Sequence, residues 1–264
     1  MMIRKEAWNV LTEHQRTTAR AFIAERERER RHLVVYLSGA HAYGFPSPDS
    51  DLDIKCIHIA PTASIVGLDV VHDPPSRIDI VEGVELDYGS NELAPVLRGA
   101  IKGNGNYLER VLGELALAGD AELLAEARQA VRPLLSRRVS RHYGGFAASQ
   151  LRAFDERPTA KRALYVLRTA ATGRHLLATG KLVTDLTQLR EYAPPELDEL
   201  LAIKQRGEQS ELAPERAAAL RAHLVAAIAA IAQGWSTSVL PTEPPEDKIA
   251  AADAWLRDVR RRSW

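Results

Sequence analysis

One stretch decides the fold class of this chain: HLVVYLSGAHAYGFPSPDSDLDIKCIHI, residues 32–59. It begins with a β-branched run of strand length at residues 32–37, followed by three small residues, Ser-Gly-Ala. Two prolines and a glycine at residues 44–50 predict a loop. Residues 51–59 alternate polar with apolar side chains, which is the period of a half-buried strand. The stretch therefore predicts two strands joined through a tight turn and a loop.

The flanking sequence predicts a mixed part followed by a helical part. Residues 3–31 have helical spacing, and residues 77–80 and 84–88 have the pattern of two further strands. No strand is predicted past residue 90, and helices are expected at residues 92–101, 106–112, 121–135, 139–155, 160–179, 196–205, 214–233 and 246–261. The predicted fold class is α+β, with a small mixed-sheet domain at residues 1–115 and an all-helical domain at residues 116–264.

The composition narrows the class of protein. The chain has 35 basic and 35 acidic residues, so no net field draws it toward nucleic acid or acidic lipid. Its single cysteine, Cys56, excludes an internal disulfide and a multi-cysteine zinc site, and we expect a buried, inert thiol. The N-terminus lacks the apolar core of a signal peptide, and no run of about 18 apolar residues stands out. We therefore expect a cytoplasmic protein without a membrane span.

Asp51 and Asp53 are the first candidate functional residues. Because they lie two apart in a predicted strand, both side chains project from one face, while Leu52 and Ile54 point into the core. Two carboxylates this close repel each other unless a cation lies between them, and hard oxygen ligands suit magnesium. Surface strands also carry such pairs by chance, so the surrounding sequence has to support the assignment.

The small-residue turn before the pair gives that support. At Ser38, Gly39 and Ala40 the minimal side chains let backbone N–H groups approach a phosphate, and a following helix would offer its positive N-terminus. Ten residues separate Ala40 from Asp51, enough for the chain to return along an adjacent strand. We expect the phosphate-binding turn and the acidic pair to lie close together.

Residues 38–59 resemble the signature of the DNA polymerase beta superfamily: an apolar strand, a Gly-Ser or Gly-Gly turn, a spacer, then Asp-apolar-Asp-apolar. Within that superfamily, the segments AYG (42–44) and PDSD (48–51) are most similar to predicted nucleotidyltransferases that include RNA-repair-associated members. Later blocks also match that group: GNGNYLE (103–109), YGGFA (143–147), RTAATGRHLLATGKLVTDL (168–186) and SVLP (238–241). The resemblance covers residues 38–241.

This resemblance implies a magnesium-dependent nucleotidyltransferase with a third carboxylate on a neighbouring strand. Asp87, Glu85 and Asp79 are the candidates, and we favour Asp87 because its distance before the GNGNYLE block fits the family pattern. The alternative interpretation of Asp87 is a cap for the following helix. Two Mg²⁺ ions, or Mn²⁺ in their place, held by Asp51, Asp53 and Asp87 would align ATP or another nucleoside triphosphate. Asp87 would also be the base for the acceptor hydroxyl.

Nucleotide binding is expected at Ser38, Gly39, Ala40, Ser50 and Asn104. The group usually has serine at the second turn position, where this chain has Ala40. The change removes one side-chain hydrogen bond, worth about 1.5–3 kcal/mol when made to a charged group. Ser38 or Ser50 could compensate. Basic helical residues such as Lys102, Arg168 and Lys204 could reach phosphates, but side chains of this type are usually solvated.

The expected reaction transfers a nucleoside monophosphate from the triphosphate to an acceptor hydroxyl and releases pyrophosphate. An RNA end is one candidate acceptor, and arginine-rich segments at residues 132–141 and 257–262 could supply a basic patch for it. A protein or a small molecule is an equally open acceptor. The alternative hypothesis is a nucleotide-binding or regulatory protein that keeps the fold with reduced or no turnover, and Ala40 motivates it.

Overall fold

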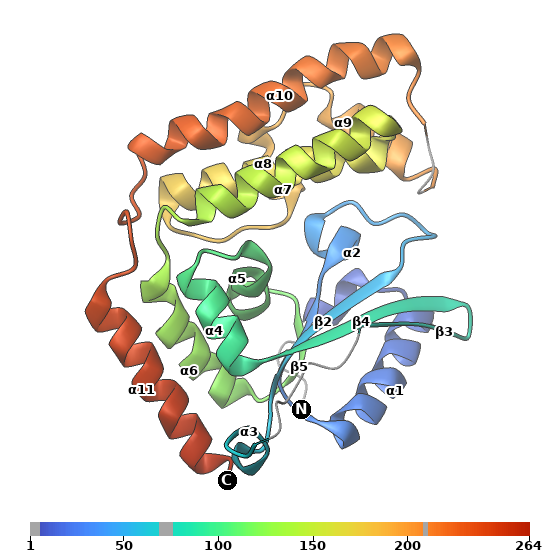
Figure 1. Ribbon diagram of the computed structural model, residues 1–264. Coiled ribbons are helices and arrows are strands. Elements are labelled where there is room, and N and C mark those ends of the chain that lie inside the picture. Colours follow the sequence, from blue (N-terminus) through green and yellow to red (C-terminus); the bar gives the residue numbers. More distant parts are fainter. Residues whose placement is uncertain (1–5, 69–75, 208–210) are drawn as a thin grey trace. The chain divides into compact units, whose positions relative to one another are not determined.

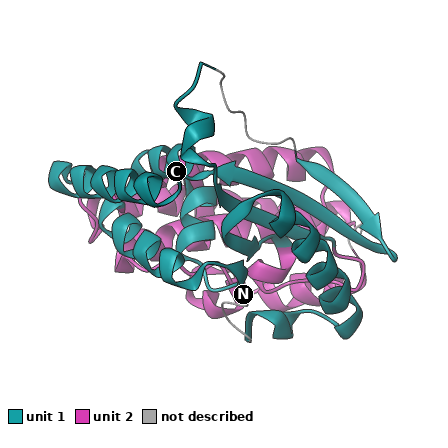
Figure 2. Ribbon diagram, turned by 90° about the horizontal axis from the view of Figure 1, so that it is seen from below, with its two compact units in different colours: residues 1–39, 51–134, 244–264 teal, residues 40–50, 135–243 magenta. Residues whose placement is uncertain are grey.

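The computed structural model describes residues 6–68, 76–207 and 211–264. The chain forms two compact units, and each is built from separated parts of the sequence (Figure 2). The first unit comprises residues 1–39, 51–134 and 244–264, and the second comprises residues 40–50 and 135–243. The predicted domains divide the chain at residue 115, whereas the first compact unit extends to residue 134, includes residues 244–264 and leaves residues 40–50 to the second unit.

A mixed five-stranded sheet forms the centre of the first unit, with strand order β3-β4-β2-β1-β5 (Figure 1). Only β2 and β4 pair in parallel; the other pairs are antiparallel. The strands are β1 (Arg31–Leu37), β2 (Leu52–Ile59), β3 (Arg77–Val81), β4 (Val84–Glu92) and β5 (Ala116–Gly119). The first four confirm the predicted strands. β5 corrects the expectation of no strand past residue 90, because alanine and glycine have low strand propensity and only pairing with β1 gives this segment its conformation.

Helices cover both faces of this sheet (Figure 1). One face packs Leu52, Ile54 and Cys56 of β2 against Trp8 and Phe22 of the N-terminal helices. The helical elements of the first unit are η1 (Glu6–Val10), α1 (Glu13–Glu29), α3 (Thr62–Ile65), α4 (Leu93–Ile101), α5 (Gly105–Leu112), α6 (Ala121–Val131), η2 (Arg132–Leu134) and α11 (Glu246–Arg262). The sheet thus has an apolar core on one face, and its other face carries polar side chains of β2 and β4.

The predicted N-terminal helix is interrupted rather than continuous. η1 ends at Val10, and Thr12 caps α1 by accepting a hydrogen bond from the Gln15 N–H, while the Gln15 side chain accepts one from the Thr12 N–H. This reciprocal pair is a capping box, which fixes a helix start. The single helix expected from residue 3 is therefore wrong about the break at Thr12, and residues 3–5 lie outside the described part of the chain.

The second unit is helical. Its elements include α7 (Val139–Glu156), α8 (Ala160–Thr179), η3 (Leu186–Gln188), η4 (Arg190–Tyr192), α9 (Leu197–Lys204) and α10 (Pro214–Ser236). α8 coincides with its predicted range, because Thr159 caps its first turn and Gly180 ends it in a left-handed conformation with φ of 69°. The short helix α2 (Gly39–Tyr43) starts with the last residue of the first unit and continues into the second. Together the sheet and the helices confirm the α+β class.

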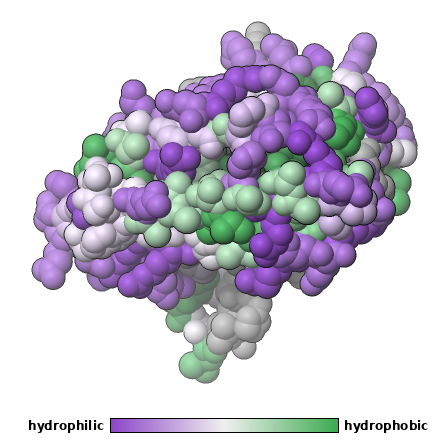
Figure 3. Space-filling model, turned by 90° about the horizontal axis from the view of Figure 1, so that it is seen from above, coloured by the Kyte–Doolittle hydropathy of each residue, from purple (hydrophilic) through white to green (hydrophobic). Residues whose placement is uncertain are grey.

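Helix α10 bears on the expectation that the chain has no membrane span. Among the described residues it is the one helix long and apolar enough, by length and composition alone, to cross a membrane. Only 22% of its apolar window is buried, with Leu220, Leu224 and Ile231 on the buried side of a helix that contacts α7 and α8. The face of the molecule over α10 has a pale, weakly hydrophobic band among hydrophilic residues (Figure 3). Much of this outer side of the helix is alanine, which accounts for its apolar composition.

Candidate active site

The parallel pairing of β2 and β4 places Asp53 directly opposite Asp87. Paired residues project from the same face of a sheet, and this face is opposite to the one on which Leu52 and Leu86 enter the core. The two carboxylate side chains are only 19% and 29% exposed. Strand register therefore brings together two of the three predicted metal ligands.

The same register separates the three candidates for the third carboxylate. Asp79 of β3 pairs with Leu86, so it projects toward the apolar face, away from Asp53. Glu85 shares the face of Asp87 but lies two residues before it in β4, opposite Ile80 of β3, and is exposed. Of the three, Asp87 alone stands in register with Asp53. This geometry favours Asp87 for the role, which stays a prediction.

Lys55 is a residue of this site that the sequence analysis missed. Its ammonium lies 2.6 Å from Asp87 Oδ1 and 3.9 Å from Asp53 Oδ1, and it donates to the Asp87 carbonyl at 3.3 Å. Lys55 is two residues after Asp53 and so shares its face of β2, a signal that was present in the sequence. The bridging position became visible only with the register of β2 and β4.

Gly39 packs directly against the Asp53 carboxylate. Its φ is +64°, and a Cβ added to it would lie 1.8 Å from Asp53 Oδ2. The neighbouring Ser38 N–H donates to the Asp53 carbonyl at 2.8 Å. This N–H is consequently engaged within the protein, so any phosphate contact of Ser38 would use its hydroxyl group. A glycine in this turn is therefore needed to admit the Asp53 carboxylate.

The loop before Asp51 is held by a buried lysine of the second unit. Lys204 of α9 has no exposed surface, and its ammonium donates to Ser47 Oγ at 2.5 Å and to Ser50 Oγ at 3.2 Å. The Ser47 N–H also donates to Ser50 Oγ, at 3.0 Å. The expectation of a solvated Lys204 is therefore wrong. The hydroxyl of Ser50 serves to fix the loop, and its predicted contact with the nucleotide stays a prediction.

Aromatic residues of the motif are embedded in the same unit. Arg168 of α8 is 2% exposed and places its guanidinium 3.4 Å from the centre of the Tyr43 ring. Tyr165 packs edge-on against the rings of both Tyr43 and Phe45. The expectation that Arg168 is solvated is thus wrong too, since it is a buried support for the motif. The family blocks at residues 42–50 and 168–186 are adjacent in space.

The remaining predicted residues are positioned as follows. Asp51 directly precedes β2 and is half-buried. Ala40 is 2% exposed within α2, and the Asn104 side chain accepts the Asn106 N–H at 3.0 Å as the N-cap of α5. Among the described residues, no group of three or more histidine, cysteine or carboxylate side chains is arranged to hold a metal ion. Asp51 is therefore not assembled with Asp53 and Asp87 into a ready ligand set.

Other ionisable groups of the first unit are structural. Cys56 is fully buried, as predicted, and burial raises the pKa of its thiol to about 12. Burial likewise lowers the pKa of His32 to about 4, and its Nε2 lies 2.8 Å from the Tyr88 hydroxyl. A buried thiol of this kind stays protonated, and a buried imidazole of this kind stays neutral near pH 7. Neither supplies a reactive group.

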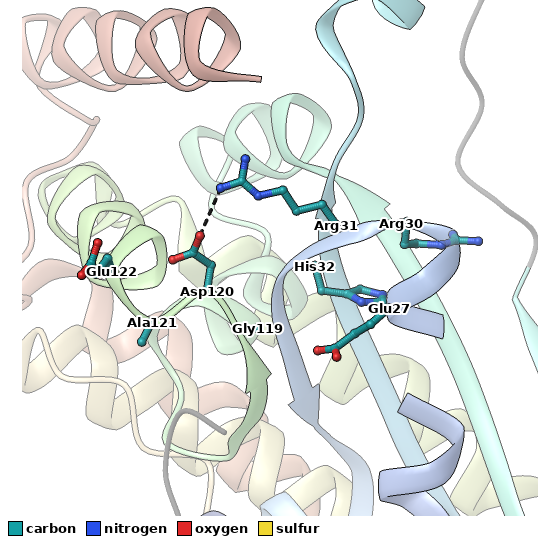
Figure 4. A pocket seen from close by; sticks show the side chains of 8 residues that line it. All are labelled: Glu27, Arg30, Arg31, His32, Gly119, Asp120, Ala121 and Glu122. Atoms are coloured by element: carbon teal, nitrogen blue, oxygen red, sulfur yellow. Dashed lines mark hydrogen bonds and ion pairs between the residues drawn. The ribbon is translucent and has the colours of Figure 1, made fainter. Parts of the chain in front are cut away.

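A pocket of about 400 Å³ lies where α1 ends, β1 begins and α6 starts (Figure 4). Its charged side chains are of both signs, and Arg31 pairs with Asp120 at 3.1 Å across it. Arg31 begins β1, whereas Leu37, at the other end of the strand, pairs with Ile54 beside Asp53. A strand of this length spans about 20 Å, so the pocket is separate from the carboxylates.

Comparison with known proteins identifies the class to which this fold and this carboxylate pair belong. A family model described as "RNA repair pathway DNA polymerase beta family" matches residues 15–258. The chain is accordingly of the polymerase beta-like nucleotidyltransferase class. It belongs to the RNA repair pathway DNA polymerase beta family, which confirms the resemblance found in the sequence.

Individual relatives add little to this assignment. The chain is 24% identical over 160 residues to "Uncharacterized protein MJ0002" of Methanocaldococcus jannaschii, a match that covers 60% of this chain and 65% of that protein, under two thirds of its length. It is also similar to a crystal structure of a nucleotidyltransferase-like protein from Exiguobacterium sibiricum 255-15, with 12% identity. That match covers 93% of this chain and 79% of the other, but its TM-score of 0.33 is too low to bear on the fold.

Proposed function

We propose that this chain is a magnesium-dependent nucleotidyltransferase that transfers a nucleoside monophosphate from a nucleoside triphosphate to an acceptor hydroxyl and releases pyrophosphate. The observation that carries this proposal is the in-register pair of Asp53 and Asp87, with Gly39 packed against the first of them. Two aligned carboxylates on one sheet face, beside a turn of small residues, suit the binding of a cation together with a polyphosphate.

The donor set is appropriate for the cation. Asp53 and Asp87 supply hard oxygen ligands, and the Lys55 ammonium beside them indicates that a positive charge is favourable at this position. We assign Asp53 and Asp87 as the residues that would hold Mg²⁺, or Mn²⁺ in its place, with Asp51 as the third ligand once a second ion and the nucleotide are bound. The bound cation would supply charge neutralisation at the triphosphate.

The protein groups around the cation then have distinct roles. Asp87 is the base we assign to the acceptor hydroxyl, since its carboxylate is partly exposed on the site face. Gly39 keeps the Asp53 carboxylate in place through close contact, and Ser38 binds the Asp53 carbonyl. Lys204 and Arg168 are positioning residues, because they fix the loop and the aromatic residues that precede Asp51. Asn104 stays a candidate for nucleotide contact.

Pyrophosphate release measured with ATP, GTP, CTP and UTP, with and without Mg²⁺, tests the proposal. We expect Asp53→Asn and Asp87→Asn each to abolish release. Asp79→Asn is the matched control, since this residue lies in the same sheet but faces the apolar side, and it should leave release unchanged. Release that survives Asp53→Asn would refute the assignment. A stronger loss in Glu85→Gln than in Asp87→Asn would exchange their roles.

The second candidate function is a nucleotide-binding protein with the same fold and reduced or no turnover. Ala40 in place of the usual serine favours it, as does the absence of an assembled three-carboxylate group among residues 6–68, 76–207 and 211–264. Calorimetry with the same four nucleotides separates the two functions. Tight binding without pyrophosphate release under any metal condition would establish this second function over the first.

The proposed acceptor hydroxyl belongs to an RNA end, a protein or a small molecule. An RNA end fits the name of the family, but the arginines expected to contact RNA are largely engaged elsewhere. Arg260 pairs with Glu92, Arg262 with Glu126, and Arg138 with Glu243. Incubation with each labelled nucleotide and total cellular RNA, protein or small molecules would identify the labelled fraction. Label in the RNA fraction supports an RNA acceptor, and label only in protein or small molecules replaces it.

A further inference from the structure

Lys55 occupies the position between the two site carboxylates. Its ammonium is 2.6 Å from Asp87 Oδ1 and 3.9 Å from Asp53 Oδ1, and the three side chains are 19–29% exposed. In partly desolvated surroundings a full positive charge at these distances interacts strongly with both acids. The ammonium therefore relieves the repulsion that two aligned carboxylates would otherwise exert on each other.

The pairing of β2 with β4 brings this lysine to the carboxylate of the neighbouring strand. Lys55 pairs with Gly89 of β4, two residues beyond Asp87 on the same face. The aliphatic part of Lys55 passes beside Gly89: a Cβ built there would meet Lys55 Cδ at 3.8 Å and Nζ at 4.0 Å, which are ordinary van der Waals contacts. The lysine thus reaches from β2 across to the carboxylate on β4, and its ammonium also bonds the Asp87 carbonyl.

We propose that Lys55 is the built-in counter-ion of the Asp53–Asp87 pair, and that its ammonium competes with the divalent cation until a triphosphate accepts it. This inference rests on the proposed function, since it assumes that the cation binds these two acids. Without nucleotide, a metal ion has to displace the ammonium and binds weakly. With nucleotide, the displaced ammonium gains phosphate oxygens as acceptors, so metal and triphosphate bind together more readily than either does alone.

Binding of Mn²⁺ to the nucleotide-free protein, followed by electron paramagnetic resonance, tests this competition. We expect Lys55→Met to bind Mn²⁺ about tenfold more tightly than the wild type, because a competing unit charge has gone. The same variant should bind a non-hydrolysable triphosphate more weakly. Lys248→Met is the matched control: this exposed lysine pairs with Asp247 at 2.9 Å in α11, and its loss should change neither affinity.

Thermal unfolding gives a readout that does not depend on activity. Without metal, Lys55→Met should unfold at a lower temperature than the wild type, because the positive charge beside its two acids has been removed. Mn²⁺ should bring the unfolding temperature of the variant back toward that of the wild type. Lys55→Gln repeats the test with a polar side chain if the methionine variant folds poorly.

The possible outcomes separate this inference from the proposed function. Unchanged or weaker Mn²⁺ binding in both lysine variants, with binding still abolished by Asp53→Asn, would overturn the role of Lys55 and leave the metal assignment intact. No Mn²⁺ binding in the wild type, or binding indifferent to Asp53→Asn, would overturn the metal assignment and the competition with it. Tighter binding in both variants, lost again when Asp53→Asn is added, would support both.

Discussion

Gly39 has two structural roles in its short motif. From the sequence, its small size allows a phosphate to approach the backbone. The structure adds a positive φ of +64° and a carboxylate oxygen of Asp53 in the place where a Cβ would be. The glycine therefore controls the position of the Asp53 carboxylate, which we propose as a metal ligand, independently of any contact with a nucleotide.

Gly39→Ala should separate these effects from ordinary backbone strain. We expect a strain of roughly 1–2 kcal/mol from the left-handed conformation and a displaced Asp53 carboxylate, with pyrophosphate release reduced by about 100-fold. Gly83→Ala is the control, since Gly83 has a φ of +79° but nothing within 4 Å of its Cβ position. Urea unfolding should show similar losses in both variants. Equal release by the two variants would contradict the role given to Gly39.

His32 gives the first unit a pH dependence with a defined sign. Burial lowers its folded pKa from 6.5 to about 4. Because the unfolded chain then binds more protons between these values, this contribution to stability is complete above pH 6.5 and is lost as the pH falls toward 4. The loss amounts to about 3 kcal/mol.

Chemical denaturation between pH 4 and 7.5 checks this prediction. His32→Gln should remove most of the acid-side loss, whereas His14→Gln, a change at an exposed histidine, should retain the wild-type profile. The same acid-side slope in the wild type and His32→Gln would show that burial of His32 is not its cause.

At the scale of elements, the motif depends on helices far away in the sequence. Residues 40–50 belong to the second unit, where α8 supports Tyr43 and α9 supports the loop through Lys204. Gln205, next to Lys204, also donates to the Pro46 carbonyl at 2.6 Å. The loop that leads into Asp51 is therefore held by side chains of helices that lie outside the motif.

Lys204→Met should loosen this loop without removing any group from the carboxylate pair. Hydrogen bonds to a charged donor are worth about 1.5–3 kcal/mol, so amide exchange at Ser47 and Ser50 should accelerate by tenfold or more. Pyrophosphate release should fall in parallel. Lys181→Met, at an exposed lysine of the same unit, is the control. Protection of these two amides at the wild-type level in Lys204→Met would contradict the positioning role.

At the scale of the whole molecule, the chain returns to its first unit at the C-terminal end. Two contacts attach α11 to this unit: the Trp255 Nε1–H donates to Glu126 at 2.8 Å, and Arg260 pairs with Glu92. Glu92 ends β4 and also caps α4 by accepting the Ala94 N–H at 2.7 Å. The last helix is consequently part of the framework that carries Asp87, although it follows the helical unit in the sequence.

Arg260→Ala should show how much the stability of the first unit depends on the attachment of α11. The Arg260 and Glu92 side chains are 12% and 9% exposed, and removing one partner from such a pair costs about 3 kcal/mol. Arg257→Ala breaks an exposed pair with Asp253 on the same helix and should cost about 0.5 kcal/mol or less. Urea unfolding measures both. Equal, small losses would show that α11 is not anchored through this pair.

The sequence alone determined the parts of this protein that depend on neighbours along the chain. A β-branched run located β1, alternation located β2, helical spacing located α8, and the spacing of small and acidic residues together with the later sequence blocks indicated the family. These features follow from covalent adjacency, since side-chain period and capping need only a few consecutive residues.

Only the tertiary structure decided which distant residues meet. β5 exists because it pairs with β1, and Asp87 is favoured over Asp79 because the register of β2, β4 and β3 turns one toward Asp53 and the other away. The same register places Lys55 between the two carboxylates, and folding of the second unit buries Lys204 under the motif loop. Strand register and packing join segments far apart in sequence, and no local pattern records them.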